Sequence, residues 1–563
     1  MPDLHMKHWP PGVPTTLTVP DRTVAQNLAA TAARVPDRTA LIYYGARISY
    51  AALWHDVERI AGWLTSMGVD RGDRVVIDMQ NGPQWIIAYY AILRADAAVV
   101  PANPMYRAAE LDHILRDSGA RIAIVGTELV DHLRPQLASG ALDHLLAAAC
   151  ADMAAPEGRA DMPAELRDRS DSDVDGPGIT RWREALEAHH APGPHAAGPD
   201  DLAVLLYTSG TTGQPKGCVH RHRNIQQVTH TYLPMAPYTD DTVILTVMPF
   251  FHVTGMQNGM NAPLAAGATL VQMTRWDTAL ALRLIERHRV TMWRSITAMV
   301  IDLMRALDDT PADISSLRLI GAGGAAVPEA VARRLHALTG LKIVEGYGMS
   351  ETAGVTHMNP NHAPREQCLG IPVFDVDARV IDLDDGHELG PDKAGEIVIA
   401  APQVFDGYWR NDAATAAAFT KIDGKRFLRT GDIGLYDGDG YFYMTDRLKR
   451  MINASGYKVW PAEVEALMHR HPDVAEACVV GLPDPRRGET VVAHVVRRSG
   501  AALDEAALAA WCRAEMAAYK VPHAIRFVPA LPRSGTGKVQ WREIAAAEAD
   551  SALAATQDDR AAG

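Results

Sequence analysis

YTSGTTGQPKG, residues 207–217, is the most informative stretch of this chain. Small hydroxylated residues alternate with glycines there, and Lys216 follows them. Glycine lets the backbone approach a ligand closely, and consecutive backbone N–H groups in such a turn form a hollow that binds anions. The apolar run AVLLY at 203–207 precedes the turn and has the length of a buried strand. A strand that enters a Gly/Thr-rich turn predicts a phosphate-binding loop.

The spacing excludes the common phosphate loop, whose pattern is G-x-x-x-x-G-K followed by Ser or Thr. Gly210 and Gly213 are three residues apart, and Pro215 stands directly before Lys216. Gly217 follows the lysine, so no hydroxyl group is placed there for magnesium. The alternative is a flexible Ser/Gly linker, which the strand-like flank disfavours.

The composition is that of an ordinary globular protein. Its 563 residues are too many for one hydrophobic core, so we expect at least two domains. A net charge of −13 disfavours a nucleic-acid partner, because such partners require a basic face. The cysteines form no C-x-x-C pair, which predicts a reducing compartment and no zinc site: Cys150, Cys218, Cys368, Cys478 and Cys512.

Neither a targeting segment nor a membrane span is predicted. The N-terminus, MPDLHMKHWPPGVP, lacks the apolar core of a signal peptide. The most apolar stretch, 85–93, is nine residues long and cannot cross a bilayer. We therefore expect a cytoplasmic protein. Transient membrane contact and a homodimer are left open, although no basic amphipathic helix supports membrane contact.

Strand and helix patterns alternate over 22–126 and 201–345, which predicts an α/β fold with largely parallel sheets. Short strands with Gly/Asp turns over 369–445 predict a small β-rich subdomain. Residues 151–200 are rich in Ala, Asp, Pro and Gly, which indicates a surface insertion or a mobile loop, with Trp182 in a short helix. The pattern changes after Asp446, so we expect a large domain over 1–446 and a small α+β domain over 447–563.

A second chemical cluster is GYGMSET at 346–352. Tyr347 between two glycines offers a flat face on which a base can stack. Ser350 and Thr352 can donate hydrogen bonds to phosphate, and the Glu351 carboxylate is a hard oxygen ligand suited to magnesium. The alternative is a polar turn after a strand.

Four shorter clusters are ambiguous alone. TGD at 430–432 offers an aspartate for ribose hydroxyls or is a hairpin turn. GAGG at 321–324 lets a flat group pass the backbone or is only a turn. DRLKR at 446–450 is a hinge or a solvated charged face. Lys538, which ends PRSGTGK at 532–538, is either solvated or an electrostatic catalyst near phosphate.

These clusters, in this order, resemble the adenylate-forming superfamily of acyl-CoA synthetases, peptide-synthetase adenylation domains and beetle luciferases. The similarity runs from about residue 22 to 543 and includes DRLKRMINASGYKVWPAEVE at 446–465. It implies a large N-terminal domain, a small mobile C-terminal domain and an active site between them. It also implies ATP, Mg²⁺ and CoA as cofactor and co-substrates.

The resemblance assigns roles residue by residue. The triphosphate loop would be Thr208, Ser209, Gly210, Thr211, Thr212, Gly213 and Lys216. The remaining nucleotide contacts would be Gly323, Gly324, Tyr347 and Gly348, with Asp432 and Arg447 on the ribose. Thr352 matches a phosphate-contacting threonine, Glu351 the magnesium ligand and Lys538 the lysine required for adenylation.

Other matches concern the acid, CoA and the domain movement. His252 matches the aromatic gate beside the acyl pocket, and Lys449 matches the hinge. Ser455, Gly456 and Tyr457 resemble the turn that approaches CoA. We expect an acyl pocket with no charged partner for a polar acid tail, lined by Phe251, Val253, Met256 and Gly321.

The resulting prediction is an acid–CoA ligase that acts on a medium- or long-chain fatty acid through an acyl-AMP. An aryl-CoA ligase of the coumarate or benzoate kind shares every motif above. An acyl-AMP ligase that loads a carrier protein is a further alternative. A nucleotide-binding pseudoenzyme is disfavoured by the presence of Glu351, Asp432, Arg447 and Lys538.

Overall fold

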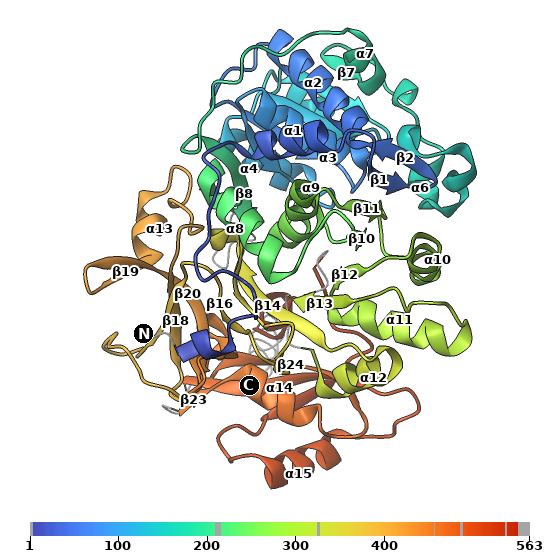
Figure 1. The fold of residues 1–563 in the computed structure, drawn as a ribbon. Helices are drawn as coiled ribbons and strands as arrows, with labels where there is room; N and C mark the ends of the chain where they lie inside the picture. Colours follow the sequence, from blue (N-terminus) through green and yellow to red (C-terminus); the bar gives the residue numbers. More distant parts are fainter. Residues whose placement is uncertain are drawn as a thin grey trace, which may run out of the picture. The chain divides into compact units, whose positions relative to one another are not determined.

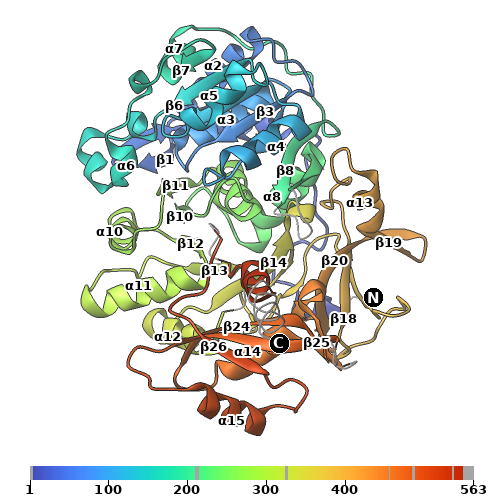
Figure 2. The same cartoon turned by 180° about the vertical axis from the view of Figure 1, so that it is seen from behind.

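The computed structural model describes residues 4–208, 215–323, 327–454, 457–484, 488–534 and 538–549, without the side chains of Lys449, Tyr457 and Lys458. Figures 1 and 2 show it from two sides. The chain divides into two compact units, residues 1–377 with 399–428 and residues 378–398 with 429–563. Each unit is described by itself. The predicted α/β class is confirmed, because both units contain sheets with helices packed along them.

The larger sheet of the first unit has the strand order β16-β15-β14-β13-β12-β10-β11-β1-β2. Its central strands are parallel, whereas β2, β15 and β16 pair antiparallel at the two edges. The blue strands β1 and β2 lie beside the green β11 in Figure 1, although they are far apart in sequence. The strands are β1 (Thr39–Tyr43), β2 (Ala46–Ser49), β10 (Val243–Thr246), β11 (Thr269–Gln272), β12 (Met292–Ser295), β13 (Leu319–Gly323), β14 (Ile343–Met349), β15 (Gly354–Met358) and β16 (Ile371–Pro372).

Helices cover both faces of this sheet, which explains why most side chains of its parallel strands are buried. On one face Trp293 and Ile320 pack with apolar side chains of α10 (Thr278–His288), α11 (Thr297–Asp309) and α12 (Glu329–Thr339). On the other face Met292, Leu319 and Val344 belong to the core formed with α8 (His222–Met235), the π-helix η5 (Thr254–Asn261) and α9 (Ala262–Ala266). Successive strand residues therefore face different cores.

The second sheet of this unit has the order β7-β6-β5-β3-β4-β8-β9 and is parallel except for β9. Its strands are β3 (Arg74–Asp78), β4 (Ala98–Pro101), β5 (Ile122–Gly126), β6 (His144–Ala148), β7 (Ile179–Arg181), β8 (Leu202–Thr208) and β9 (Lys216–Arg221). The accompanying helices are α1 (Val24–Arg34), α2 (Tyr50–Ser66), α3 (Pro83–Arg94), α4 (Ala108–Ser118) and α5 (Val130–Ala138).

Local sequence explains where several helices begin. The Ser49 side chain accepts a hydrogen bond from the backbone N–H of Ala52 and caps α2, and Asp277 caps α10 in the same way. Pro83 occupies the first turn of α3, where its missing N–H costs nothing. The α3 side chains from Pro83 to Leu93 are buried, so this apolar stretch is a core helix rather than a membrane segment.

Residues 151–200 contain regular structure. The segment holds α6 (Ala164–Arg167), β7, α7 (Trp182–Glu187) and short 3₁₀ turns. Strand β7 pairs with β6, and Trp182 at the start of α7 is buried. The predicted short helix containing Trp182 is confirmed as α7. Residues 179–181 are an edge strand rather than part of a mobile loop, because pairing with β6 outweighs the Ala/Asp/Gly-rich composition around them.

The second unit contains two groups of strands. One group is β17 (Asp377–Ile381), β18 (Gly395–Ala400), β20 (Lys425–Tyr436) and β21 (Phe442–Arg447). The start of β20, residues 425–428, belongs to the first unit, where it pairs with β19 (Phe419–Ile422), which follows α13 (Asp412–Ala417). The other group is β22 (Ile452–Ala454), β23 (Tyr457–Val459), β24 (Val474–Asp484), β25 (Gly488–Arg497) and β26 (Ala524–Phe527). It packs with α14 (Pro461–Met468) and α15 (Glu505–Glu515). The boundary at 446/447 stays a prediction.

Within the described ranges, no helix is both long enough and apolar enough to cross a membrane.

Gly62 tests the packing of the 151–200 segment against α2. An added Cβ there would lie 2.1 Å from the carbonyl oxygen of His190. Gly→Ala in a helix usually stabilises by about 1 kcal/mol, but an overpacked contact costs roughly 1–3 kcal/mol. We expect Gly62→Ala to lower the thermal midpoint. The control is Gly193→Ala, whose Cβ would meet nothing within 4 Å. A higher midpoint for Gly62→Ala would show that the segment does not rest on the helix.

Asp78, at the end of β3, predicts a pH-dependent stability. The residue is buried, and neither carboxylate oxygen has a hydrogen-bond partner among the described residues. Burial, with the nearby Glu128 carboxylate, raises the pKa of Asp78 from 3.8 to about 8. The folded state therefore holds a proton that the unfolded state releases above pH 4. Stability is lost as pH rises from about 4 to 8, on the order of several kcal/mol.

We expect Asp78→Asn to be more stable than the parent at pH 8 and to show a smaller decrease between pH 5 and 8. Denaturant unfolding at both pH values measures the difference. Asp309→Asn is the control, since Asp309 is exposed. Equal pH dependence in parent and Asp78→Asn would mean that Asp78 is ionised in the folded protein.

Candidate active site

The two ends of the predicted phosphate loop lie side by side. Thr208, the last residue of β8, pairs with Lys216, the first residue of β9, in an antiparallel ladder. The Lys216 ammonium lies 5.1 Å from the centre of the Tyr408 ring, within cation–π range. Residues 209–214 lie outside the described residues, so Ser209, Gly210, Thr211, Thr212 and Gly213 stay predictions.

Helix α4 and the segment just before α13 contact the residues that flank this loop. The Nε2 atom of His113 lies 2.9 Å from the carbonyl oxygen of Pro215. The Tyr207 hydroxyl donates to the Asp117 carboxylate at 2.5 Å. The backbone N–H of Trp409 donates to the carbonyl oxygen of Gly217 at 2.7 Å. These contacts fix the described residues that flank the predicted loop.

The GYGMSET segment ends β14 and forms a tight return into β15. At Gly348 an added Cβ would lie 1.9 Å from the carbonyl oxygen of Gly354, so only glycine fits. Glu351 lies in the 3₁₀ turn η6 (Ser350–Thr352) and is only 9% exposed. Its Oε1 accepts a 2.9 Å hydrogen bond from the Tyr408 hydroxyl. Burial, with the Glu351 charge, raises the pKa of Tyr408, so the hydroxyl keeps the proton it donates.

Two further side chains hold the same turn. The Thr352 hydroxyl is fully buried and lies 2.7 Å from the carbonyl oxygen of Gly354. His220 Nε2 lies 2.7 Å from the carbonyl oxygen of Ser350. Burial lowers the pKa of His220 to about 4, so its neutral ring donates there. Thr352 thus stabilises the turn that carries Glu351, and its predicted phosphate contact stays a prediction.

The predicted adenine site is partly assembled. Gly323 ends β13 and pairs with Gly346 of β14, leaving two neighbouring strand positions without side chains. Tyr347 lies on β14 with its ring centre 5.7 Å from that of His357. Gly324 is outside the described residues.

The predicted acyl wall follows β10 and enters η5. Phe251 and His252 are half-buried, whereas Val253 and Met256 are buried. Gly321 lies on β13, on the face that carries Leu319. The expectation of a wall without a charged side chain is wrong, because the buried Arg294 guanidinium lies against Gly321: an added Cβ there would be 2.1 Å from Arg294 Nη1.

The second unit brings together three predicted residues. Asp432 and Arg447 are register partners on β20 and β21, and Arg447 Nε lies 3.1 Å from Asp432 Oδ1. Lys538 lies near both: desolvation and the positive charge of Arg447 lower its pKa, and Asp432 opposes that change.

The hinge and CoA-side predictions are less complete. Lys449 lies in the 3₁₀ turn η7 (Leu448–Arg450), and its side chain is not described. Ser455 and Gly456 lie outside the described residues, and Tyr457 begins β23. Their functional roles stay predictions.

Tyr408 is the functional candidate that the sequence did not reveal. It contacts both Lys216 and Glu351, which come from two different sheets. Its only local signal is DGYW at 406–409, a pattern typical of any turn in a β-rich region.

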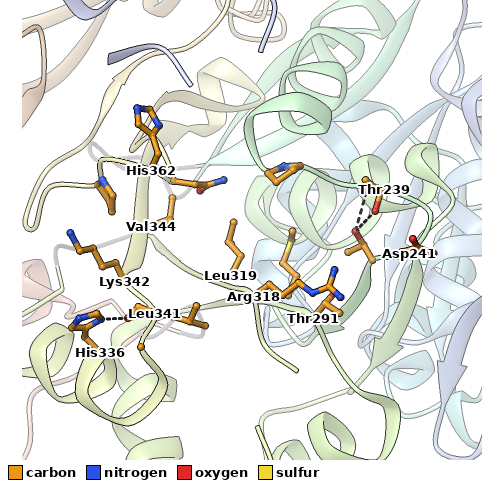
Figure 3. Close-up of a pocket in the computed structure, with 16 residues that line it drawn as sticks. Thr239, Asp241, Thr291, Arg318, Leu319, His336, Leu341, Lys342, Val344 and His362 are labelled. Atoms are coloured by element: carbon orange, nitrogen blue, oxygen red, sulfur yellow. Dashed lines mark hydrogen bonds between the residues drawn. The ribbon is translucent and has the colours of Figure 1, made fainter. Parts of the chain in front are cut away.

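A large cavity lies elsewhere. It measures about 690 Å³ and is lined at the amino-terminal ends of the strands, by Met292 of β12, Arg318 and Leu319 near β13, and Lys342 and Val344 near β14. Figure 3 shows these residues with His336 and His362. The phosphate-loop ends and Glu351 follow carboxyl ends of strands, where ligands bind in open α/β sheets. This cavity is therefore not the adenylation site.

Comparison with known proteins gives the family. A family model described as AMP-binding enzyme matches residues 28–409, and one described as AMP-binding enzyme C-terminal domain matches residues 463–538. The chain belongs to the AMP-binding enzyme family. It is an acyl-CoA synthetase, an acid–CoA ligase that uses ATP and CoA.

Three similar proteins span nearly the whole ligase. The long-chain-fatty-acid–CoA ligase of Bacillus subtilis (strain 168) is 33% identical over 97% of this chain and 98% of its own length. The feruloyl-CoA synthase of an Amycolatopsis species is 34% identical over 90% and 96%. The crystal structure of ATP-bound MatB from Rhodopseudomonas palustris has a TM-score of 0.82 at 29% identity, covering 93% and 99%.

Tyr408 links the ligase's loop lysine to its acidic turn, and Tyr408→Phe tests that link. The variant keeps the ring beside Lys216 and removes the bond to Glu351. A hydrogen bond to a charged group contributes about 1.5–3 kcal/mol, so we expect kcat/KM for ATP to fall by about ten- to a hundredfold. The control is Tyr436→Phe, whose hydroxyl donates to the backbone of Leu389. Equal losses in the two variants would contradict a specific role for Tyr408.

Proposed function

We propose that this ligase activates a medium- or long-chain fatty acid to an acyl-adenylate and then transfers the acyl group to CoA. The observation that carries the adenylation site is the Lys216–Tyr408–Glu351 arrangement at the end of the predicted phosphate loop. The apolar side chains of Val253 and Met256, and the fatty-acid ligase named among its relatives, support a fatty acid.

The first step must bring two anions together. The acid's carboxylate attacks the α-phosphorus of ATP, the bond to the β-phosphate breaks and pyrophosphate leaves. Negative charge therefore has to be neutralised before the oxygen can approach. Lys216 would hold the β- and γ-phosphates, and Lys538 would stabilise charge at the reacting phosphate. Asp432 would accept hydrogen bonds from the ribose hydroxyls, with Arg447 orienting it.

The acidic turn fits a magnesium ion. Glu351 offers hard carboxylate oxygens, and the Tyr408 hydroxyl orients one of them at 2.9 Å. Mg²⁺ bound there would supply charge neutralisation on the phosphates. Thr352 and His220 would keep the carboxylate in place through the backbone of the same turn.

The second step needs a different arrangement. The acyl-adenylate is a mixed anhydride, so water has to be excluded until CoA arrives. The small domain, predicted to begin at 447, would turn about Lys449, withdraw Lys538 and present Gly456 toward CoA. The thiol then attacks the acyl carbon and AMP leaves.

An aryl acid is the second candidate, because a feruloyl-CoA synthase is about as similar to the chain as the fatty-acid ligase. Release of AMP measured with ATP, CoA and acids from C2 to C18, together with coumarate and benzoate, tests the proposal. Greatest kcat/KM for an aryl acid would overturn the fatty-acid assignment. AMP release without a CoA thioester would indicate loading of a carrier protein, and no turnover would indicate a pseudoenzyme.

Lys538→Ala separates the two half-reactions. We expect pyrophosphate exchange to fall by at least a hundredfold, because the lysine acts on the phosphate during adenylation. Thioester formation from supplied acyl-adenylate should change less than threefold. Lys393→Ala, which removes an exposed lysine, serves as control. An equal loss in both half-reactions would contradict the two-arrangement mechanism.

A further inference from the structure

Arg294 is a buried cation that has no carboxylate partner among the described residues, although its guanidinium hydrogen-bonds to the Tyr238 hydroxyl. It lies on β12 and is 8% exposed. Its Nε and Nη2 atoms are buried and have no hydrogen-bond acceptor. Across the described ranges, no carboxylate forms an ion pair with it. Nearly all buried polar groups in proteins are hydrogen-bonded, and leaving a buried charge unpaired is strongly destabilising. The arrangement therefore requires an explanation outside the folded chain itself.

The guanidinium lies on the face of the sheet that holds the acyl wall. Arg294 is two residues after Met292 on β12, so both face the core that contains Met256 and α8. Its register partner on β13 is Gly321. Because Gly321 has no side chain, the guanidinium occupies that space, 2.1 Å from where a Cβ would be.

Two tyrosines near the guanidinium cannot neutralise it. Burial raises the pKa of both Tyr232 and Tyr238, with the charge of Arg294 opposing the rise, so both hydroxyls remain protonated at neutral pH. Both also bond to Asn258: the Tyr238 hydroxyl donates to its carbonyl oxygen at 2.9 Å, and the Tyr232 hydroxyl accepts from its amide at 2.7 Å. A ligand anion or carbonyl oxygen is the group that would complete the site.

We propose that Arg294 determines acid specificity by binding an oxygen function at the far end of the substrate, either the second carboxylate of a dicarboxylic acid or the carbonyl of an oxo acid. This rests on the proposed function and deepens it, since the chain between the two ends is still aliphatic. Arginine presents N–H donors in a fixed fork that matches carboxylate geometry, and a few placed polar groups in an apolar pocket fix ligand orientation.

The spacing of two glycines on β13 bears on the length of this substrate. Gly323, the predicted adenine contact, and Gly321 are two residues apart on β13, about 7 Å along the strand. We infer that a substrate of medium length would extend from the predicted adenylate site to Arg294. The 690 Å³ cavity lies farther along the same face, beyond Met292 and Leu319. A plain long chain would have to pass the buried guanidinium to reach it.

The test compares acids of equal carbon number: octanoate, octanedioate and 7-oxooctanoate, each with ATP and CoA. We expect kcat/KM of the parent to be at least tenfold higher for one oxygenated acid than for octanoate. Octanedioate as the better substrate identifies a carboxylate partner, and 7-oxooctanoate identifies a carbonyl partner. If kcat/KM of the parent for octanoate equals or exceeds the values for both oxygenated acids, the proposal is overturned, and no variant is needed to show it.

Variants locate the preference on the guanidinium. Arg294→Met has similar length and no charge, so it should lose the preference for the oxygenated acid and turn over octanoate at least tenfold better than the parent. Arg294→Lys should retain part of the preference, because it keeps the charge and loses the fork. The control is Arg305→Met, which removes an exposed arginine of α11 and should leave the ratio unchanged.

The remaining outcomes separate this proposal from the proposed function. An unchanged ratio in Arg294→Met would refute the role of Arg294 while leaving a fatty-acid ligase intact. A parent enzyme that forms the octanoyl thioester in preference to the oxygenated acids would likewise refute the role of Arg294 and leave a fatty-acid ligase intact. Absence of thioester from every acid in the panel would instead remove the proposed function, and with it this proposal.

Discussion

The parallel register of β12, β13 and β14 determines where the ligand groups of the first unit can lie. The register places Arg294 beside Gly321 and Gly321 beside Val344 in one row, and Gly323 beside Gly346 in another. The second row is bare backbone and leaves room for a flat group next to Tyr347. The first row carries the long, positively charged side chain of Arg294. A shift of one residue in any strand would turn these side chains to the other face.

The second constraint is electrostatic and joins the two sheets of this unit. Lys216 comes from the start of β9, whereas Glu351 follows β14, and Tyr408 contacts both. The aromatic face attracts the ammonium, and the hydroxyl donates to the carboxylate. One side chain thus keeps a cation and an anion at fixed places without letting them neutralise each other in an ion pair.

Local patterns revealed the parts of the fold and site that depend on local sequence. The apolar run before Thr208 predicted β8, and the glycines of GYGMSET predicted a tight turn, which the close approach at Gly348 explains. Tyr408 and Arg294 could not be found this way, because their importance comes from neighbours far away in sequence. From the sequence alone, a strand residue such as Arg294 resembles a solvent-exposed polar residue. Only the strand pairing places it opposite Gly321. Strand β7 was missed for the same reason, since it gains its place from β6, whereas the short helix at Trp182 was predicted.

Arg294 and Gly321 have to be considered as one unit. Any side chain at Gly321 would collide with the guanidinium, and without the guanidinium the glycine would leave an apolar gap beside Met256. An aliphatic residue at 294 would fill that space without burying a charge, and such replacements are often neutral or stabilising. Proteins tolerate destabilising groups mainly where function needs them. A substrate oxygen at the predicted acyl wall would offset that cost, which is why we assign the cation a role in specificity rather than in stability.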